Sequence, residues 1–362
     1  MQVGIVGLPV SGKTILFETL TGQYVSESHR TGKLEIHRAI VKVPDYRLDQ
    51  LTSIFSPKKK VPATIEYIEI GGIEKEKAKK VGFDSQFLQV LKTTDILCVV
   101  IRSFESEFYP HPEGTIDPKR DLQIVETEFL LSDLQIVENR IQRLEKQFMK
   151  AKDEDGLREL GQLKRYKHWL EQEKPLREFE FSEEEEFRIR GFQFLSAKPM
   201  MVVININESD IEREEEILSP IISSFDRKNL TFISMCIKIE QEISQLDIGD
   251  AKIFLKDLGI KEPALPKFIR ASYDLLGLIS FFTVGDEECH AWTVKKGTNA
   301  LKAAGTIHSD FEKGFIRAEV VNFDEFIRYE SLSKCREKGI LGLEGKNYIV
   351  KDGDLITIRF NV

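Results

Sequence analysis

The chain has 362 residues, of which 41% are hydrophobic and 31% charged, and its formal net charge is −8. These values are ordinary for a globular protein, and the length predicts two or three domains. The acidic balance excludes a global basic field for nucleic acid, so any RNA contact has to come from a local patch.

The cysteines and the hydropathy of the sequence indicate the cellular compartment. The four cysteines form no Cys-x-x-Cys pair, which indicates a reducing compartment and gives no sign of zinc. No apolar run is long enough to span a membrane, and the first residues lead directly into a motif without room for a signal peptide. We therefore expect a cytoplasmic protein with no membrane partner.

The first motif is GLPVSGKT at residues 7–14. It follows an apolar run at 1–6 that predicts a buried strand, and it precedes a run at 15–20 that predicts a helix. A strand, a glycine-rich loop ending in Gly-Lys-Thr and a helix together form a P-loop, whose backbone N–H groups bind phosphate. Lys13 is the candidate catalytic residue because its cation would stabilise the terminal phosphates, and the Thr14 hydroxyl would ligate Mg²⁺. The candidate nucleotide-binding residues here are Val10, Ser11, Gly12, Lys13, Thr14 and Ile15.

Strands and helices alternate after the P-loop, which predicts an α/β domain with a mostly parallel sheet covered on both faces. Further strands are expected near residues 38–43, 63–70, 95–101, 199–206 and 230–234. In P-loop NTPases an acidic residue at a strand end meets the Mg²⁺ shell, usually within Asp-x-x-Gly. Here Glu69 occupies that position and is a candidate metal ligand. The lysines at 58–60 are expected to be solvated surface rather than an RNA site.

From about residue 121 the pattern becomes that of a coiled coil. A second helical run covers 157–173, so the two runs predict an antiparallel helical hairpin that serves as a packing arm. Apolar side chains alternate at steps of three and four residues at Thr127, Leu130, Leu134, Val137, Ile141, Leu144, Phe148 and Ala151.

A different module begins near residue 272, where short strands separated by glycine turns predict a small α+β domain. We expect the following domain boundaries. A discontinuous P-loop domain comprises 1–125 and 190–271, a coiled-coil insert comprises 126–189, and the last domain comprises 272–362.

Several motifs resemble one family along the full length of the chain, the YchF family or Obg-like ATPases. They are VPDYRLD at 43–49, DPKRD at 117–121, Lys198-Pro199, the run at 303–320 and the ending at 352–362. The resemblance implies a P-loop domain interrupted by a coiled-coil arm and followed by a TGS domain of β-grasp fold. It also implies a translation-associated NTPase that binds ATP or GTP with Mg²⁺ and contacts the ribosome or RNA through the arm and the TGS domain. The sequence gives no oligomeric state.

The residues that would contact the base have two possible registers. The family carries Asn-x-x-Glu where GTPases carry Asn-Lys-x-Asp, and Asn205, Ile206 and Glu208 match the family pattern, which implies adenine. The alternative is the Asn-x-x-Asp at 207–210, in which guanine would be read through Asp210. The position relative to Lys198-Pro199 favours the first register.

A second base-side element of the family is Ser-Ala-Lys. In this sequence Cys236, Ile237 and Lys238 occupy its place, so Cys236 and Ile237 are candidate nucleotide-binding residues that lack the serine hydroxyl.

Departures from the family pattern bear on turnover. Val10 replaces an asparagine, and Glu69 replaces an aspartate. Ile73 stands where many GTPases place a glutamine that orients water, although a hydrophobic residue is usual there in this family. Thr31 is the candidate switch-I metal ligand, whereas the family threonine would fall near Lys33. Three functions follow: a slow ATPase, a nucleotide-sensing ribosome or RNA adaptor with little turnover, and a conventional GTPase.

Overall fold

The computed structural model describes residues 1–25, 35–71, 83–148, 154–225 and 229–361. The chain forms two compact units, which we call the P-loop unit (Met1–Ala39 and Glu66–Leu265) and the C-terminal unit (Ile40–Ile65 and Pro266–Val362). This division differs from the expected boundaries in one respect: residues Ile40–Ile65, which were expected in the P-loop domain, belong to the C-terminal unit. None of the helices in the described ranges combines the length and the hydrophobicity needed to cross a membrane.

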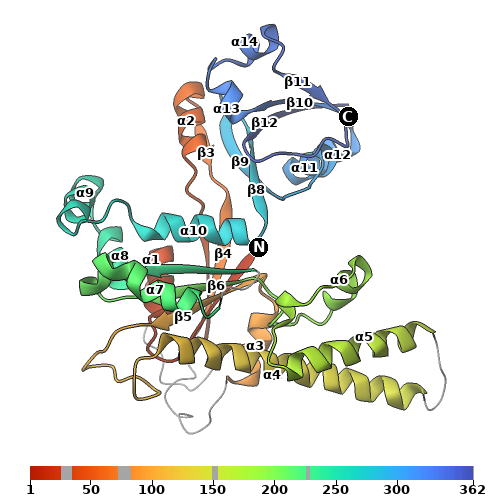
Figure 1. Ribbon diagram of the computed structural model, residues 1–362. Helices are drawn as coiled ribbons and strands as arrows, with labels where there is room; N and C mark the ends of the chain where they lie inside the picture. The colour runs from red at the N-terminus through yellow and green to blue at the C-terminus, as the bar shows by residue number, and fades with distance from the viewer. Residues whose placement is uncertain (26–34, 72–82, 149–153, 226–228, 362) are drawn as a thin grey trace. The chain divides into compact units, whose positions relative to one another are not determined.

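The P-loop unit is built on a six-stranded sheet with the order β2-β4-β1-β5-β6-β7 (Figure 1). β1 pairs in parallel with β4 and β5, and β5, β6 and β7 continue in parallel, as predicted. Every residue of β5 and β6 is buried, which is why both read as continuous apolar runs. The strands are β1 (Gln2–Val6), β2 (Glu35–Lys42), β4 (Thr64–Gly71), β5 (Ile96–Arg102), β6 (Met200–Asn205) and β7 (Leu230–Met235).

Helices pack against this sheet. Apolar side chains of α3 and α4 pack with those of β4, β5 and β6 in one core cluster. The helical elements of the P-loop unit are α1 (Lys13–Thr21), α3 (Ser85–Lys92), α4 (Pro118–Phe148), α5 (Glu154–Glu171), η1 (Leu176–Glu178), α6 (Glu183–Ile189), η2 (Glu208–Arg213), α7 (Glu214–Ile222), α8 (Ile237–Ser244) and α9 (Ile248–Asp257). α10 (Ala264–Leu275) begins at the end of this unit and lies mostly in the C-terminal unit.

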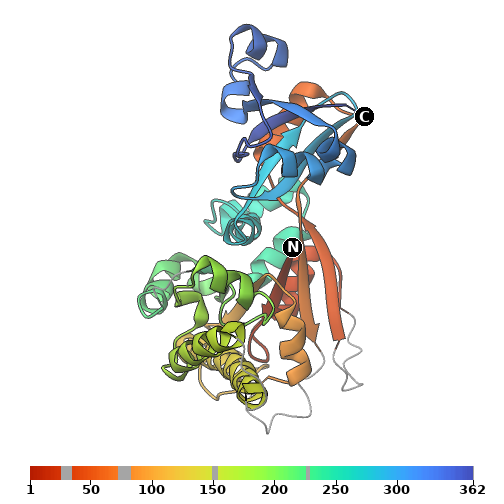
Figure 2. The same ribbon diagram turned by 90° about the vertical axis from the view of Figure 1, so that its right-hand side faces the viewer.

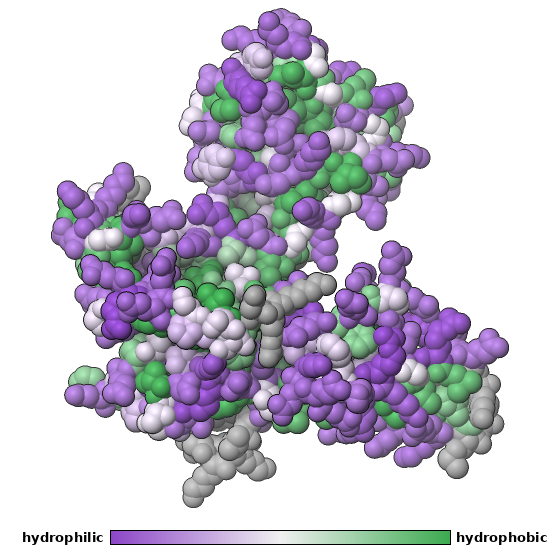
Figure 3. All heavy atoms as spheres, in the orientation of Figure 1, coloured by the Kyte–Doolittle hydropathy of each residue, from purple (hydrophilic) through white to green (hydrophobic). Residues whose placement is uncertain are grey.

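The predicted helical hairpin is confirmed in α4 and α5, which lie side by side in two perpendicular views (Figures 1 and 2). Val137 and Ile141 of α4 pack with Leu163 and Tyr166 of α5 in a separate core, and hydrophilic residues cover most of the hairpin surface in Figure 3. α4 begins at Pro118, a favoured first helical residue, and its first turns pack in the core of the sheet. The expected boundary at 125/126 therefore falls inside one continuous helix.

The C-terminal unit has its own six-stranded sheet with the order β11-β10-β12-β8-β9-β3. β8 and β9 form an antiparallel hairpin, β12 runs parallel to β8, and α11 packs on the sheet, as expected for a β-grasp fold. Its elements are α2 (Tyr46–Phe55), β3 (Lys59–Val61), β8 (Leu278–Thr283), β9 (Glu288–Lys295), α11 (Ala300–Ile307), α12 (Ser309–Lys313), β10 (Phe315–Asn322), α13 (Phe323–Phe326), α14 (Leu332–Glu337), β11 (Gly342–Glu344) and β12 (Asp354–Phe360).

The lysine side chains at 58–60 are exposed, as the prediction of solvated surface requires, but part of the run lies in a strand and not in a loop. Lys59 and Lys60 lie in β3, which pairs in parallel with β9 at the edge of the second sheet. Lys58 contacts Glu287 at 2.6 Å, and Lys59 contacts Glu288 at 3.3 Å, so carboxylates of the C-terminal unit neutralise part of the run.

Candidate nucleotide-binding site

The phosphate-binding loop connects β1 to α1 at the carboxyl edge of the parallel sheet, where ligands bind in open α/β folds. Two glycines are required by close contacts. A Cβ on Gly7 would lie 2.3 Å from the Val100 carbonyl oxygen, and a Cβ on Gly12 would lie 2.6 Å from Asn205 Nδ2. Gly12 also has a φ of 104°, which L side chains rarely adopt. The loop therefore packs directly against the ends of neighbouring strands.

The first turn of α1 is open to an anion. Gly12 is its N-cap and makes no side-chain cap hydrogen bond, and the backbone N–H groups of a first helical turn are suited to bind a phosphate. Lys13 is nearly buried, and its ammonium donates a hydrogen bond to the Leu8 carbonyl at 2.8 Å. This contact holds the cation against the loop, where it was predicted to act.

Thr14 and Glu69 come together from α1 and β4. The Thr14 hydroxyl donates to Glu69 Oε1 at 3.0 Å, and the Glu69 side chain is fully buried. A hydroxyl and a carboxylate at one point are hard oxygen donors of the kind that Mg²⁺ prefers, so the residues fit the predicted ion. His37 of β2 lies at the same place, with Nε2 4.0 Å from Glu69 Oε2 and 3.9 Å from Glu35 Oε2. The sequence offered no signal for this histidine.

Asn205 uses its side chain as a bridge. Its Nδ2 donates to the Ser11 carbonyl at 3.0 Å, and its Oδ1 accepts from the Ile237 N–H at 3.3 Å. The side chain is almost fully buried, and both of its amide atoms form hydrogen bonds with the backbone. Asn205 therefore ties the phosphate loop to the start of α8, and the two predicted ends of one nucleotide pocket are joined by a single residue.

The two candidate base readers, Glu208 and Asp210, lie in the same short helix, η2, and their charges act on different groups. Burial raises the pKa of the buried Cys236 thiol, and the nearby charge of Glu208 adds to this effect. The charge of Asp210 instead acts on Arg213, whose pKa is raised mainly by its hydrogen bond to Glu216. Glu208 is exposed at the start of η2, with its N–H donating to the Asn207 side chain. The choice between the two carboxylates as base readers stays a prediction.

The remaining candidates flank these residues or lie outside the described ranges. Val10 and Ile15 are exposed at 40% and 41%, so both are accessible, whereas Ser11 and Ile206 are buried. Thr31 and Ile73 lie outside the described residues. Within the described ranges no group of three or more His, Cys, Asp or Glu side chains could hold a metal by itself.

Arg102 is a residue of the loop environment that sequence reasoning missed. It ends β5, is buried, and pairs in register with Asn205 at the end of β6. Its Nη1 donates to the Tyr109 carbonyl at 2.8 Å and approaches the Val10 carbonyl at 3.5 Å. An arginine after an apolar strand has no distinctive sequence pattern, so only the fold identifies this position.

A glycine-rich loop between strand and helix, a lysine and a threonine at the first helical turn, and a buried carboxylate beside the threonine define a P-loop NTPase. In agreement, residues 2–140 match a family model described as a 50S ribosome-binding GTPase. Residues 278–361 match the YchF GTPase C-terminal family model, described as a protein of unknown function.

Relatives align over the whole chain. The Ribosome-binding ATPase YchF of Bacillus subtilis is 40% identical, with 100% of both chains covered. The Obg-like ATPase 1 of Caenorhabditis elegans is 34% identical, covering 100% of this chain and 92% of the relative. A solved structure of the Schizosaccharomyces pombe YchF GTPase superposes with a TM-score of 0.87 at 30% identity, covering 99% and 97% of the two chains. The chain belongs to the YchF family.

Proposed function

We propose that this chain is an ATP-preferring, Mg²⁺-dependent P-loop NTPase that hydrolyses ATP slowly and acts on the ribosome. The observation that carries the proposal is the Asn205 bridge, because it links the phosphate loop at Ser11 to the predicted base-side segment at Ile237. A pocket arranged in this way suits a nucleoside triphosphate rather than a free phosphate.

The proposed roles follow from the geometry around the loop. The Lys13 ammonium stabilises the terminal phosphates, and the N–H groups of the first turn of α1 hold their oxygens. Thr14 and Glu69 hold Mg²⁺, directly or through water, and the ion when bound neutralises charge on the phosphates. Val10, Gly12 and Ile15 complete the phosphate side, and Thr31 is proposed as a further ligand of the ion.

The base side favours adenine in this proposal. Asn205 and Ile206 position the segment, and Glu208 and the start of α8 at Cys236 and Ile237 surround the base. The alternative, a GTPase that reads guanine through Asp210, would require that carboxylate at the base instead.

The proposed partner is the ribosome, because relatives across the full length are named ribosome-binding ATPases. The contact is proposed to involve the α4–α5 hairpin and the C-terminal unit, and a ribosomal partner places the protein in the cytoplasm. A second candidate function, a nucleotide-sensing adaptor with little turnover, is favoured by Val10, which occupies a left-handed backbone conformation inside the phosphate loop.

Two measurements test the proposal. Competitive binding of ATP and GTP to the full chain with Mg²⁺ should give tighter binding of ATP, and Lys13→Ala should weaken it strongly. Phosphate release is then followed with each nucleotide, with and without ribosomes. Tighter binding of GTP would support the guanine alternative, and binding without release under any condition would support the adaptor.

A further inference from the structure

Two neighbouring strand ends contact consecutive carbonyls of the phosphate loop. Asn205, the last residue of β6, donates to the Ser11 carbonyl at 3.0 Å. Arg102, the last residue of β5 and the register partner of Asn205, directs Nη1 toward the Val10 carbonyl at 3.5 Å. The same Nη1 donates to the Tyr109 carbonyl at 2.8 Å, so Arg102 links the phosphate loop to the connection between β5 and α4.

The residue that Arg102 approaches is conformationally strained. Val10 has a φ of 55°, and a left-handed conformation is a genuine outlier for a β-branched side chain. Such a residue persists only when contacts with the surrounding structure determine its conformation. Glycine would adopt the same φ without strain. The phosphate loop therefore needs a contact that compensates for valine at this position.

Burial of the Arg102 guanidinium is energetically unfavourable. The residue is only 3% exposed, and burial lowers the pKa of its guanidinium. The charge of Asp121 offsets part of this effect, but the Asp121 carboxylate forms its ion pair with Arg120, and none of the ion pairs found among the described residues includes Arg102. Burial of a guanidinium without a paired carboxylate destabilises a fold. Packing alone would be served better by an apolar side chain, so the position of Arg102 points to a role at the loop.

We infer that Arg102 is a positioning residue that holds the phosphate loop, and Val10 in particular, in the conformation that binds the nucleotide. This inference rests on the proposed binding of ATP. Arg102 acts through the Val10 carbonyl and does not itself touch the phosphates.

A double-mutant cycle on ATP affinity tests the role, using Arg102→Met, Val10→Gly and the double variant of the full chain. Arg102→Met should weaken ATP binding about 10-fold in the wild-type background, as expected for loss of a charged hydrogen-bond donor. In the Val10→Gly background the loss should fall to about 2-fold, because glycine removes the strain that Arg102 offsets. Arg140→Met, which removes a guanidinium paired with Glu159 on the hairpin, is the control and should leave ATP affinity unchanged.

The outcomes separate this inference from the proposed function. If the wild-type chain binds no ATP, the proposed function fails. If the wild type binds ATP and Arg102→Met binds equally well, or loses the same factor in both backgrounds, the positioning role alone is refuted. Thermal unfolding of each variant shows whether the chain is folded. Should Arg102→Met not fold, Arg102→Lys enters the same cycle, where an effect that again shrinks with Val10→Gly supports the role and an effect equal in both backgrounds refutes it.

Discussion

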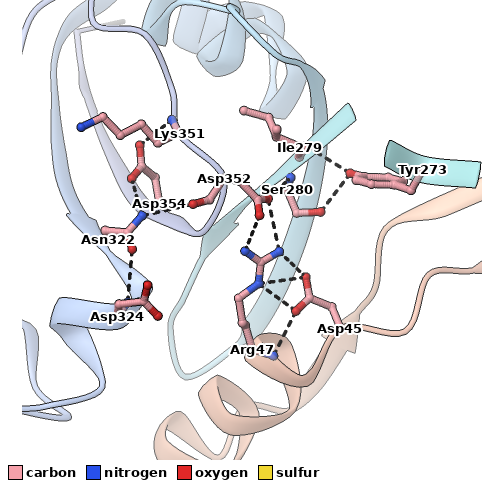
Figure 4. Close-up of polar contacts among 10 residues, drawn as sticks. All are labelled: Asp45, Arg47, Tyr273, Ile279, Ser280, Asn322, Asp324, Lys351, Asp352 and Asp354. Carbon is pink, nitrogen blue, oxygen red and sulfur yellow. Dashed lines mark hydrogen bonds and ion pairs between the residues drawn. The ribbon is translucent and has the colours of Figure 1, made fainter. Parts of the chain in front are cut away.

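Arg47 and Asp352 are 305 residues apart in the sequence, and the Arg47 guanidinium donates to both oxygens of the Asp352 carboxylate, at 2.7 and 3.2 Å (Figure 4). Asp45 accepts from Arg47 Nε at 2.9 Å, and Asp352 also accepts from the Ser280 N–H at 2.9 Å. The two motifs at 43–49 and 352–354, which supported the family resemblance, therefore meet inside the C-terminal unit. Their contact holds the segment between β2 and β4 against the second sheet.

Replacement of Arg47 should destabilise the C-terminal unit. Arg47→Met leaves Asp45 and Asp352 without their cation, and because the Arg47 side chain is only 17% exposed we expect a loss of about 3 kcal/mol in the free energy of unfolding. Arg328→Met in the same unit removes an exposed ion pair with Glu325 and should change the free energy of unfolding by less than about 0.5 kcal/mol. Urea unfolding of both variants measures the difference, and equal effects would contradict the structural role of Arg47.

Glu69→Gln should separate Mg²⁺ binding from nucleotide binding. The glutamine can still accept from the Thr14 hydroxyl, but it removes the charge that attracts the ion, so the Mg²⁺ concentration needed for tight ATP binding should rise about 10- to 100-fold. ATP affinity in excess EDTA should stay at the wild-type value. Glu66→Gln, on the same strand beside Gln2 and Arg38, is the matched control. A similar shift in both variants would argue against Glu69 as a ligand.

The root of the hairpin should respond to pH through Asp133. Burial raises the pKa of this aspartate from its ordinary value of 3.8 to about 6, although its carboxylate accepts from the Leu195 and Ser196 N–H groups. Between pH 4 and pH 6 the folded chain keeps a proton that the unfolded chain has released. The contribution of Asp133 to the free energy of unfolding therefore falls by up to about 3 kcal/mol as the pH rises through this window, and this contribution is constant above pH 6.

The difference between wild type and Asp133→Asn in urea unfolding at several pH values isolates this contribution, because other groups cancel. Asp155→Asn, which alters an exposed carboxylate of the same hairpin, should follow the wild-type profile. A wild-type minus Asp133→Asn difference that stays constant from pH 4 to pH 7 would contradict the assignment.

Substitution of Asn205 should weaken the binding of ATP and of GTP by the same factor. Because both amide atoms bond to backbone, Asn205→Ala should reduce ATP and GTP affinity together, by about 10-fold, without changing their ratio. Asn205→Asp keeps an acceptor for the Ile237 N–H but loses the donor to Ser11, so it reports on the loop contact separately. A change in the ATP to GTP ratio would instead show that Asn205 contacts the base.

The P-loop, the mostly parallel α/β sheet and the helical hairpin were predictable because their sequence signals are local. A Gly-Lys-Thr turn between an apolar run and a helix, and apolar steps of three and four residues, are visible within short windows. The fold class, the hairpin and the family membership are confirmed on this basis. The roles of the residues expected to contact the nucleotide base remain predictions.

Features that depend on distant partners were not predictable. β3 was missed because a run of lysines does not look like a strand, and because the pairing of Lys59 with Glu288 joins residues 229 positions apart. For the same reason the sequence did not assign residues 40–65 to the C-terminal unit. The bridging role of Asn205 and the position of Arg102 also became visible only through contacts with carbonyls of the phosphate loop, which no side-chain pattern encodes.

The placement of the segment between β2 and β4 has a consequence for synthesis of the protein. During translation α2 and β3 leave the ribosome long before the strand that completes their sheet, since Lys58 meets Glu287 only 229 residues later. Until then the exposed edge of β3 and the apolar side of α2 have no folded neighbour of their own unit. β3 can therefore pair only after the last quarter of the chain has been synthesised, and a truncation before β9 would leave α2 and β3 without the sheet on which their unit is built.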